Sequence, residues 1–435
     1  MSKFDLRNSI GVRLIIIVFI TVLLLIPSFM IMVLITERQE RRNSVADEVS
    51  RNWGARQTVV GPVLDIPINF PSANSSDKSA GLVSYAHFLP ERLEITGAMM
   101  PEIRNRGIYD VVVYNGDIEI KAIFNVPQFD GLAADKGKAM LENAVVTLGI
   151  SDMKGVKERI QFQWNGEVKE ANPGLPSSDL FYSGVSVPVS IKEADSEYSF
   201  VTRLNLNGSF ELLFSPIGKE TMLHLSSPWQ NPSFTGIYLP DERKLDDNGF
   251  QADWRVLYIS RDFPQKWVGG GYDLNKSAFG VSLLQPVDQY QQTMRTVKYS
   301  IMFIALTFLT FFVIEIRSLN PIHPIQYLLV GLALLIFYSL LLSLSEYISF
   351  GYAYLLAGAA IVILITAYST SFLADRRRAL IVAGVMAILY GYLYIILQLQ
   401  DYALLMGTII LFVALALLMF LTRKIDWFGT LEQKR

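Results

Sequence analysis

The sequence predicts an integral membrane α-helical protein with six transmembrane helices, arranged one plus five, and a large all-β, antiparallel, sandwich-like outer domain. Two observations lead to this prediction. Residues 299–421 contain only eight of the 38 basic and 40 acidic side chains of the 435-residue chain. In residues 36–298, short runs of alternating apolar and polar residues recur between turn signals, which is typical of antiparallel strands. The chain therefore divides between lipid and water.

The first predicted span is Leu14–Ile35, which carries no charge and is followed by Thr36-Glu37-Arg38. A transmembrane helix needs about 20 apolar residues. Pro27 is tolerated there because neighbouring helices can satisfy the freed carbonyl group. The hydrophobic region of a cleaved signal peptide is about 7–15 residues long, so we interpret this longer run as an uncleaved anchor that follows a cytoplasmic tail, residues 1–13.

Five further apolar runs predict a C-terminal bundle, separated by short connections and followed by a second cytoplasmic tail, residues 422–435. The predicted spans are 299–316, 325–345, 351–370, 379–397 and 402–421. Prolines in the connections suit helix ends, since the residue before a proline avoids the helical conformation.

The distribution of Lys and Arg predicts that both termini are cytoplasmic and that residues 36–298 are periplasmic. With the N-terminus inside, Arg317 and Arg376–Arg378 fall in cytoplasmic connections, and the two short outer loops contain no Lys or Arg. Arginines such as Arg41 and Arg295, which flank the outer domain, oppose this orientation. Long domains are translocated largely regardless of charge, so we give them less weight.

Four Asn-Gly pairs in the outer domain predict β-hairpins, because a type I′ turn needs two residues with positive φ. They begin at Asn115, Asn165, Asn207 and Asn248. Only Ala134–Ala144 has a helical pattern. About 260 residues fit one large sandwich or two small ones, in which case Asn172–Asp179 is the expected seam.

The composition argues against several kinds of chemistry. The balance of 38 basic and 40 acidic residues gives no reason to expect a nucleic-acid partner. The lack of cysteine excludes disulfides, thiol nucleophiles and Cys-ligated metals. His87, His224 and His323 are far apart, so we expect structural roles for them and neither a metal nor a cofactor. Gly269–Gly271 leads into a strand-like segment and is predicted to be a flexible loop. We therefore do not expect an enzyme.

Aromatic residues supply the remaining site candidates. In the outer domain, Trp229, Trp254 and Trp267 could form a platform for a ligand, although strand tryptophans more often belong to the core. The spans lack the mid-membrane ionisable residues expected of a pump or ion-coupled transporter. They are rich in tyrosine instead, which favours helix packing but leaves a tyrosine-lined cavity as an alternative. Its candidate residues are Tyr338, Tyr390 and Tyr394.

Short strings along nearly the whole chain resemble the CreD family of bacterial inner-membrane, cell-envelope integrity proteins. Each string is weak by itself, and their order makes the resemblance specific. They include Trp53-Gly54, Gly61–Leu64, Arg106–Tyr109, Pro228-Trp229, Pro232–Gly236, Gly249–Trp254, Phe279–Val281, Pro286–Tyr290, His323–Tyr327, Ser343–Glu346 and Thr422–Trp427. The resemblance implies an inner-membrane location and a link to envelope maintenance and envelope stress responses. It implies no catalytic residue.

Three functional hypotheses follow. In the leading one, the protein is non-enzymatic, six helices hold it in the lipid bilayer, and its periplasmic β-domain binds or senses an envelope glycan, lipid or protein. In the second, the C-terminal bundle transports a substrate or handles lipid. In the third, the protein is a membrane-tethered enzyme that acts on the cell wall through a pair of carboxylates.

Overall fold

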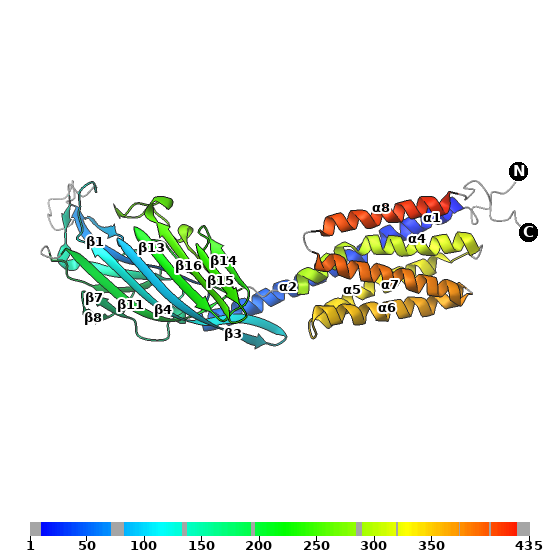
Figure 1. Cartoon of the computed structure of the whole chain (residues 1–435), viewed down its shortest axis with the longest axis horizontal. Helices are drawn as coiled ribbons and strands as arrows, with labels where there is room; N and C mark the ends of the chain where they lie inside the picture. The colour runs from blue at the N-terminus through cyan, green and yellow to red at the C-terminus, as the bar shows by residue number, and fades with distance from the viewer. Residues whose placement is uncertain are drawn as a thin grey trace, which may run out of the picture. The chain divides into compact units, whose positions relative to one another are not determined.

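The computed structural model describes residues 10–70, 82–132, 137–192, 196–283, 289–318, 321–373, 375–399 and 402–423. The chain forms two compact units (Figure 1). We call residues 1–42 together with 287–435 the helical unit, and residues 43–286 the β-domain.

The first predicted span lies within a long N-terminal helical segment. Helix α1 (Ile10–Leu23) and helix α2 (Leu25–Trp53) are separated by Leu24 alone. Pro27 accounts for this interruption, because its ring clashes with the carbonyl group four residues earlier, at Leu23, and it has no N–H to donate. The helix extends to Trp53, so residues 36–53 of the predicted β-rich segment are helical and the first strand begins at Gln57.

Five of the remaining helices lie at the predicted spans. They are α4 (Ser300–Ser318), α5 (Pro324–Ser345), α6 (Phe350–Phe372), α7 (Arg376–Gln398) and α8 (Ala403–Thr422). Helix α3 (Gln289–Lys298) lies within residues 36–298, the segment predicted to be β-rich. Among the described residues, five helices are long and apolar enough to cross a membrane: the N-terminal one and α4 to α7. In α8, the predicted sixth span, the apolar stretch Leu405–Leu417 is shorter.

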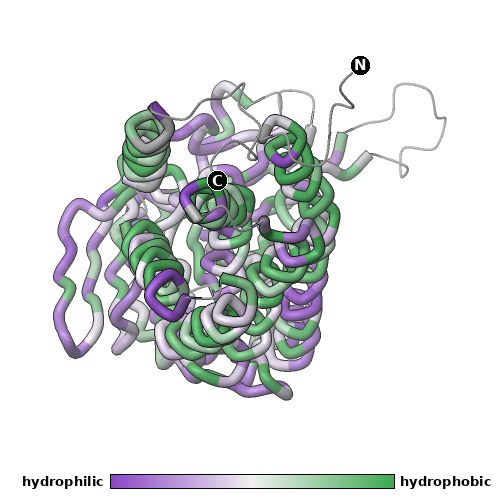
Figure 2. The backbone as a smooth tube through the Cα atoms, turned by 90° about the vertical axis from the view of Figure 1, so that its right-hand side faces the viewer, coloured by the Kyte–Doolittle hydropathy of each residue, from purple (hydrophilic) through white to green (hydrophobic). Residues whose placement is uncertain are grey.

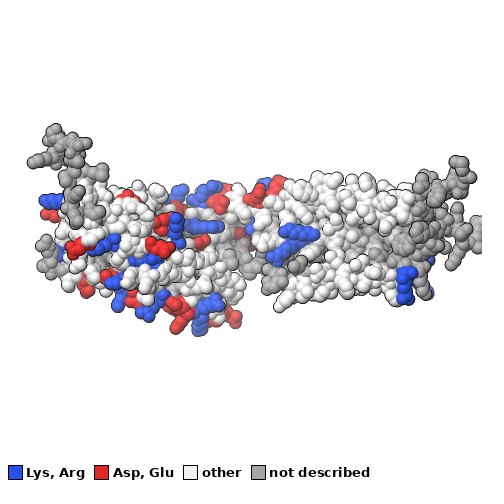
Figure 3. Space-filling view, turned by 90° about the horizontal axis from the view of Figure 1, so that it is seen from above, with Lys and Arg blue, Asp and Glu red and all other residues white. Residues whose placement is uncertain are grey.

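The helices of this unit are hydrophobic along most of their length (Figure 2). In Figure 3 the visible surface of the helical unit shows charged side chains only toward its two ends, whereas they are spread over the β-domain. This is the distribution that a helical bundle needs in a bilayer, where a charged group at the centre is costly.

Polar contacts join several of the helices. Glu315 of α4 is buried and accepts hydrogen bonds from Arg13 of α1 at 2.6 Å and from the Tyr327 hydroxyl of α5 at 2.8 Å. At the start of α5, His323 and Gln326 form a capping box, and Pro324 occupies the first turn. The predicted structural role of His323 is therefore confirmed.

The β-domain contains two sheets, as the alternating pattern predicts. In the described part of the chain, one sheet has ten strands and the other has eight. The ten-stranded sheet consists of β1 (Gln57–Phe70), β2 (Leu82–Phe88), β5 (Lys138–Ala139), β6 (Val145–Ile150), β9 (Asn172–Pro173), β10 (Gly184–Pro188), β12 (Glu211–Phe214), β14 (Pro232–Gly236), β17 (Lys266–Val268) and β18 (Phe279–Leu283).

The second sheet has the strand order β15-β16-β13-β3-β4-β11-β7-β8. Its strands are β3 (Arg92–Arg106), β4 (Tyr109–Asn125), β7 (Gln161–Trp164), β8 (Glu167–Glu170), β11 (Glu197–Ser209), β13 (Glu220–Ser227), β15 (Glu242–Asp246) and β16 (Gly249–Leu257). Neighbours are mostly antiparallel, as predicted, but β1 with β12 and β3 with β13 are parallel.

One hydrophobic core joins the two sheets. Leu64 and Val146 of the first sheet belong to the same cluster of buried residues as Ile95 and Leu225 of the second. The β-domain is therefore one large sandwich, and Asn172–Asp179 is not a seam between two smaller ones.

The Asn-Gly predictions have mixed outcomes. Asn165-Gly166 forms the predicted turn between β7 and β8, with φ of 45° and 84°. The hairpin at Asn248 exists, but its two-residue loop is Asp247-Asn248 and Gly249 begins β16. The turns predicted at Asn115-Gly116 and Asn207-Gly208 are wrong, because both pairs lie within continuous strands, β4 and β11.

Packing explains the glycine of the pair Asn207-Gly208. Asn115 and Asn207 lie opposite each other in neighbouring strands. The buried ring of Tyr114 crosses the backbone of Gly208, where an added Cβ would lie 2.2 Å from the tyrosine hydroxyl oxygen. That hydroxyl donates to the carbonyl of Glu211 at 2.7 Å. Gly208 thus provides space for a side chain rather than a turn.

The helix predicted at Ala134–Ala144 is also wrong over its described residues. Lys138–Ala139 forms strand β5 beside β1, and Leu141–Asn143 forms a single 3-10 turn. Pairing with an existing strand prevails over a weak local helical preference, because the sheet also satisfies the backbone hydrogen bonds of the segment.

Candidate functional site

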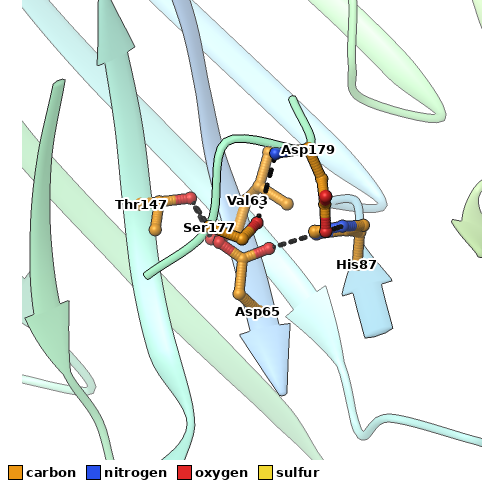
Figure 4. A network of polar contacts seen from close by, with 6 residues as sticks. All are labelled: Val63, Asp65, His87, Thr147, Ser177 and Asp179. Carbon is orange, nitrogen blue, oxygen red and sulfur yellow. Dashed lines mark hydrogen bonds and ion pairs between the residues drawn. The ribbon is translucent and has the colours of Figure 1, made fainter. Parts of the chain in front are cut away.

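A buried histidine and two carboxylates form a polar cluster in the β-domain (Figure 4). The antiparallel register of β1 and β2 places Asp65 directly opposite His87. Nδ1 of His87 lies 2.6 Å from Oδ1 of Asp65, and both side chains are almost completely buried. Thr147 of β6 donates its hydroxyl to the other oxygen of Asp65 at 2.7 Å. The sheet thus presents a polar group at a position that would otherwise belong to the core.

The second carboxylate comes from the connection between β9 and β10. Oδ2 of Asp179 lies 3.5 Å from Nε2 of His87, so the imidazole is placed between two acidic groups. Burial raises the pKa of Asp65 above its ordinary value, although the neighbouring His87 opposes this shift. The indole of Trp267 packs against the imidazole with ring centroids 5.5 Å apart. The cluster therefore ties a surface loop to the interior of the sheet.

A cavity of about 500 Å³ lies next to this cluster, and Asp179 belongs to its wall. Two loops, residues 178–183 and 272–275, form its sides above β1 and β6. The side chain of Tyr182 is 95% exposed, and Tyr272 is also exposed. Polar groups come from Asp179, Asp273 and Asn275, while none of the described residues that line the cavity is basic. The cavity is therefore acidic, with aromatic rings at its surface.

Specific contacts hold the first loop in place. Phe181 is buried against Gly149, where an added Cβ would lie 2.8 Å from the phenyl ring. The backbone N–H of Ile150 donates to the carbonyl of Ser183 at 3.1 Å. The glycine run Gly269–Gly271 approaches the other side of Asp179, since a Cβ on Gly270 would lie 3.8 Å from Oδ1 of Asp179. The predicted flexible loop thus lies beside the cavity.

The structure does not bring the three candidate tryptophans together at this cavity. Trp254 and Trp267 are buried on strands of different sheets, and Trp229 is partly buried against the core. The ring of Trp254 contacts Phe234 and Phe279. A ligand platform would need exposed ring faces, and packing within the core covers the rings of Trp254 and Trp267.

His224 has a partner that resembles that of His87 but lies at the surface. Its Nδ1 is 2.6 Å from Oδ1 of Asp253 on the neighbouring strand β16, and both side chains are about half exposed. The pair lines a shallow groove of about 730 Å³ that Trp254 also borders. Within the described residues, no three His, Cys, Asp or Glu side chains are placed to hold a metal ion.

The candidate tyrosines of the helical unit pack against one another. Tyr338 and Tyr390 are buried around Phe337, and the hydroxyl of Tyr354 donates to the backbone carbonyl of Tyr390 at 2.7 Å. The ring of Tyr394 packs against that of Tyr354 in a tilted arrangement, with ring centroids 5.3 Å apart. In this arrangement the aromatic groups fill the space between α5, α6 and α7.

Sequence reasoning missed the partners of His87. Asp65 and Asp179 lie 22 and 92 residues away along the chain, so no local spacing connects them to the histidine. One signal was present, because Asp65 is the only charged residue in the apolar run Thr58–Phe70. A charged side chain in a fully buried strand is rare unless it is paired.

Comparison with known proteins decides the family. The model of the family described as "Inner membrane protein CreD" matches residues 9–428. The chain belongs to the CreD family. The CreD protein of Escherichia coli K-12, named as an inner membrane protein, is 35% identical over 416 residues, which cover 94% of this chain and 91% of the relative. Together with the apolar helices, this makes the CreD-family chain an inner-membrane protein.

A solved structure gives no comparable information. A Legionella pneumophila protein crystallised as a candidate nutrient binding protein aligns with 48% of this CreD-family chain and 72% of its own chain, at 10% identity. The TM-score is 0.19, which is too low to support any statement about a shared fold.

Proposed function

We propose that this CreD-family protein is a non-enzymatic protein of envelope integrity and envelope stress, whose β-domain faces the periplasm and binds a neutral, hydroxyl-rich envelope component such as a glycan. One observation carries the proposal: the cavity of about 500 Å³ between the two loops has an almost fully exposed Tyr182 at its wall. Concave sites with aromatic surfaces and a few polar groups are the usual form of a ligand site.

The chemistry of the wall favours this ligand class. Tyrosine rings offer flat apolar faces to the C–H face of a sugar, and their hydroxyl groups can donate and accept hydrogen bonds. The carboxylates of Asp179 and Asp273 accept hydrogen bonds from hydroxyl groups, and the amide of Asn275 can do both. Anionic ligands are disfavoured, since they would approach two acidic side chains without a compensating cation.

Asp179 gives the site a means of sensing its ligand. The same carboxylate lines the cavity and contacts the buried imidazole of His87. A ligand hydroxyl that binds Asp179 competes with this contact and changes how firmly the loop 178–183 is held. Occupancy of the cavity would therefore alter the order of the loop, which a protein partner can read.

Binding to full-length protein in lipid nanodiscs tests the proposal. The probe is a tetramer of N-acetylglucosamine, a neutral sugar, compared with its de-N-acetylated, cationic form. We expect Tyr182→Ala and Asp273→Asn to weaken binding of the neutral probe at least about tenfold, the worth of one or two good contacts. Tyr258→Ala is the matched control, because this half-exposed tyrosine lies outside the cavity. Absent binding, or equal loss in the control, would refute the assignment.

The proposed orientation rests on the Lys and Arg distribution. Because the chain lacks cysteine, single cysteines at Asp117, Ser349 and Arg376 can be labelled in cells without background. An impermeant reagent should label positions 117 and 349 and leave 376 unlabelled. Labelling at 376 and protection at 117 would reverse the topology.

A second candidate function, a membrane-tethered enzyme acting on the cell wall, is favoured by one observation: Asp179 and Asp273 line the same cavity. Glycosidases need two carboxylates about 5–9.5 Å apart. Both residues already have structural partners, since Asp179 contacts His87 and Asp273 accepts from the backbone N–H of Asn275. Release of reducing ends from the tetramer, abolished by Asp179→Asn, would establish this alternative.

A further inference from the structure

An apolar groove of about 610 Å³ lies within the helical unit where α4, α7 and α8 meet. Its described walls come from the C-terminal part of α4, the N-terminal half of α7 and the C-terminal part of α8. Representative side chains are Leu309, Val313, Val385, Leu389, Val413 and Leu417. The tyrosines considered above are not among the residues that line it.

The groove has the length of one lipid leaflet. On α4 its lining runs from Leu306 to Arg317. The eleven rises of about 1.5 Å between these two residues give roughly 16 Å, which is half of a hydrocarbon core about 30 Å thick. A single acyl chain therefore matches the apolar part of the groove in both polarity and length.

Two arginines line the same groove. Arg317 lies in the last turn of α4 and Arg378 in the first turn of α7. Arg317 is exposed, and the described residues supply neither a hydrogen-bond nor an ion-pair partner for it. Nε of Arg378 lies 3.7 Å from Asp375, a long ion pair. Arg13, by contrast, is neutralised by the buried Glu315 at 2.6 Å. With Asp375 as the acidic partner of Arg378 and none for Arg317 among the described residues, this end of the groove carries a net positive charge.

We propose that this groove binds one anionic phospholipid, with an acyl chain along α4, α7 and α8 and its phosphate between Arg317 and Arg378. Guanidinium groups match phosphate oxygens with paired N–H donors, and basic pockets between transmembrane helices bind anionic headgroups. A zwitterionic lipid offers the same acyl chain, but its headgroup has a weaker net attraction to the two arginines. This inference does not depend on a ligand of the β-domain.

Native mass spectrometry of the full-length protein tests this site. The protein is reconstituted with defined mixtures of phosphatidylglycerol and phosphatidylethanolamine, and the retained lipids are counted. We expect one phosphatidylglycerol to be retained in preference. Each arginine near an anionic headgroup contributes about a fivefold factor, so the double variant Arg317→Gln/Arg378→Gln should lower the affinity on the order of 30-fold.

The neighbouring arginines provide a matched control. Arg376→Gln/Arg377→Gln removes the same charge from the same end of α7, yet neither residue lines the groove. This control should retain the lipid. If the control lost phosphatidylglycerol as much as the double variant, the effect would come from the general surface charge, and the proposal would be overturned. Equal retention of the two lipids by the wild type would also overturn it.

A variant that keeps both arginines tests the binding of the acyl chain separately from the attraction of the headgroup to the charge. Ala414→Trp places a large side chain in the groove from α8. We expect it to displace the retained phosphatidylglycerol while the protein stays folded, as judged by its melting temperature. A photoactivatable phosphatidylglycerol should crosslink to α4, α7 or α8 in the wild type. Crosslinks confined to other helices, or full retention in Ala414→Trp, would overturn the proposal.

Discussion

Replacing His87 with leucine should strongly destabilise the β-domain. The substitution replaces the imidazole with an apolar side chain of similar size. It leaves the carboxylate of Asp65 with Thr147 as its remaining close partner. Removing one partner of a buried hydrogen-bonded pair leaves a charge or polar group without that partner in a medium of low dielectric constant. The consequence should appear as a loss of folding free energy rather than a local change at the surface.

The structure supplies both the magnitude and the control. The His87 and Asp65 side chains are 1% and 5% exposed, which places the expected loss at about 3–5 kcal/mol. His224 and Asp253 have the same 2.6 Å separation, but their side chains are 43% and 53% exposed. A surface pair of this kind contributes about 0–1 kcal/mol, so His224→Leu should cost no more than that. Burial alone distinguishes the two substitutions.

Denaturant unfolding of the full-length protein, followed by tryptophan fluorescence, measures the difference. Five of the six tryptophans lie in residues 43–286, so the signal reports mainly on the β-domain. Trp267 packs directly on His87 and should respond to the substitution. If His87→Leu and His224→Leu cost the same free energy of unfolding, the argument from burial is wrong.

Three further predictions follow. Burial raises the pKa of the Asp65 carboxyl group above its ordinary 3.8, so this group contributes stability to the folded state below pH 3.8. The melting temperature of the wild type should therefore fall relative to that of Asp65→Asn as the pH rises from 3.8 through the raised pKa. A difference in melting temperature that stays constant over this range would contradict the prediction. Gly208→Ala should cost about 1–3 kcal/mol in the same unfolding assay, because the new methyl group displaces the ring of Tyr114. Tyr327→Phe removes a buried hydrogen bond to the Glu315 carboxylate and should cost about 1.5–3 kcal/mol, measured as thermal stability in detergent; an unchanged melting temperature would exclude a stabilising role for this contact.

The sequence predicted the candidate site only in part. It singled out His87 and the run Gly269–Gly271, but it assigned the first a plain structural role and the second a flexible loop. The cavity depends on Asp179, and on Phe181 filling the space over Gly149. These contacts join strands and loops that are distant along the chain, and no local pattern encodes them.

The sequence by itself determined the features that depend on local composition. A run of about 20 apolar residues has few alternatives to a membrane helix, and alternation with a period of two has few alternatives to a half-buried strand. For this reason the helices α4 to α7 and the two-sheet β-domain were predicted correctly.

Tertiary structure decided what residues of the same type do in different places. Asn165-Gly166 forms a turn, whereas Asn207-Gly208, the same pair of residue types, lies in a strand in which Gly208 is covered by Tyr114. His87 and His224 have equivalent aspartate partners, and only strand position buries the first. A dipeptide or a single side chain carries no information about which distant surface will cover it, and that surface sets both its energy and its function.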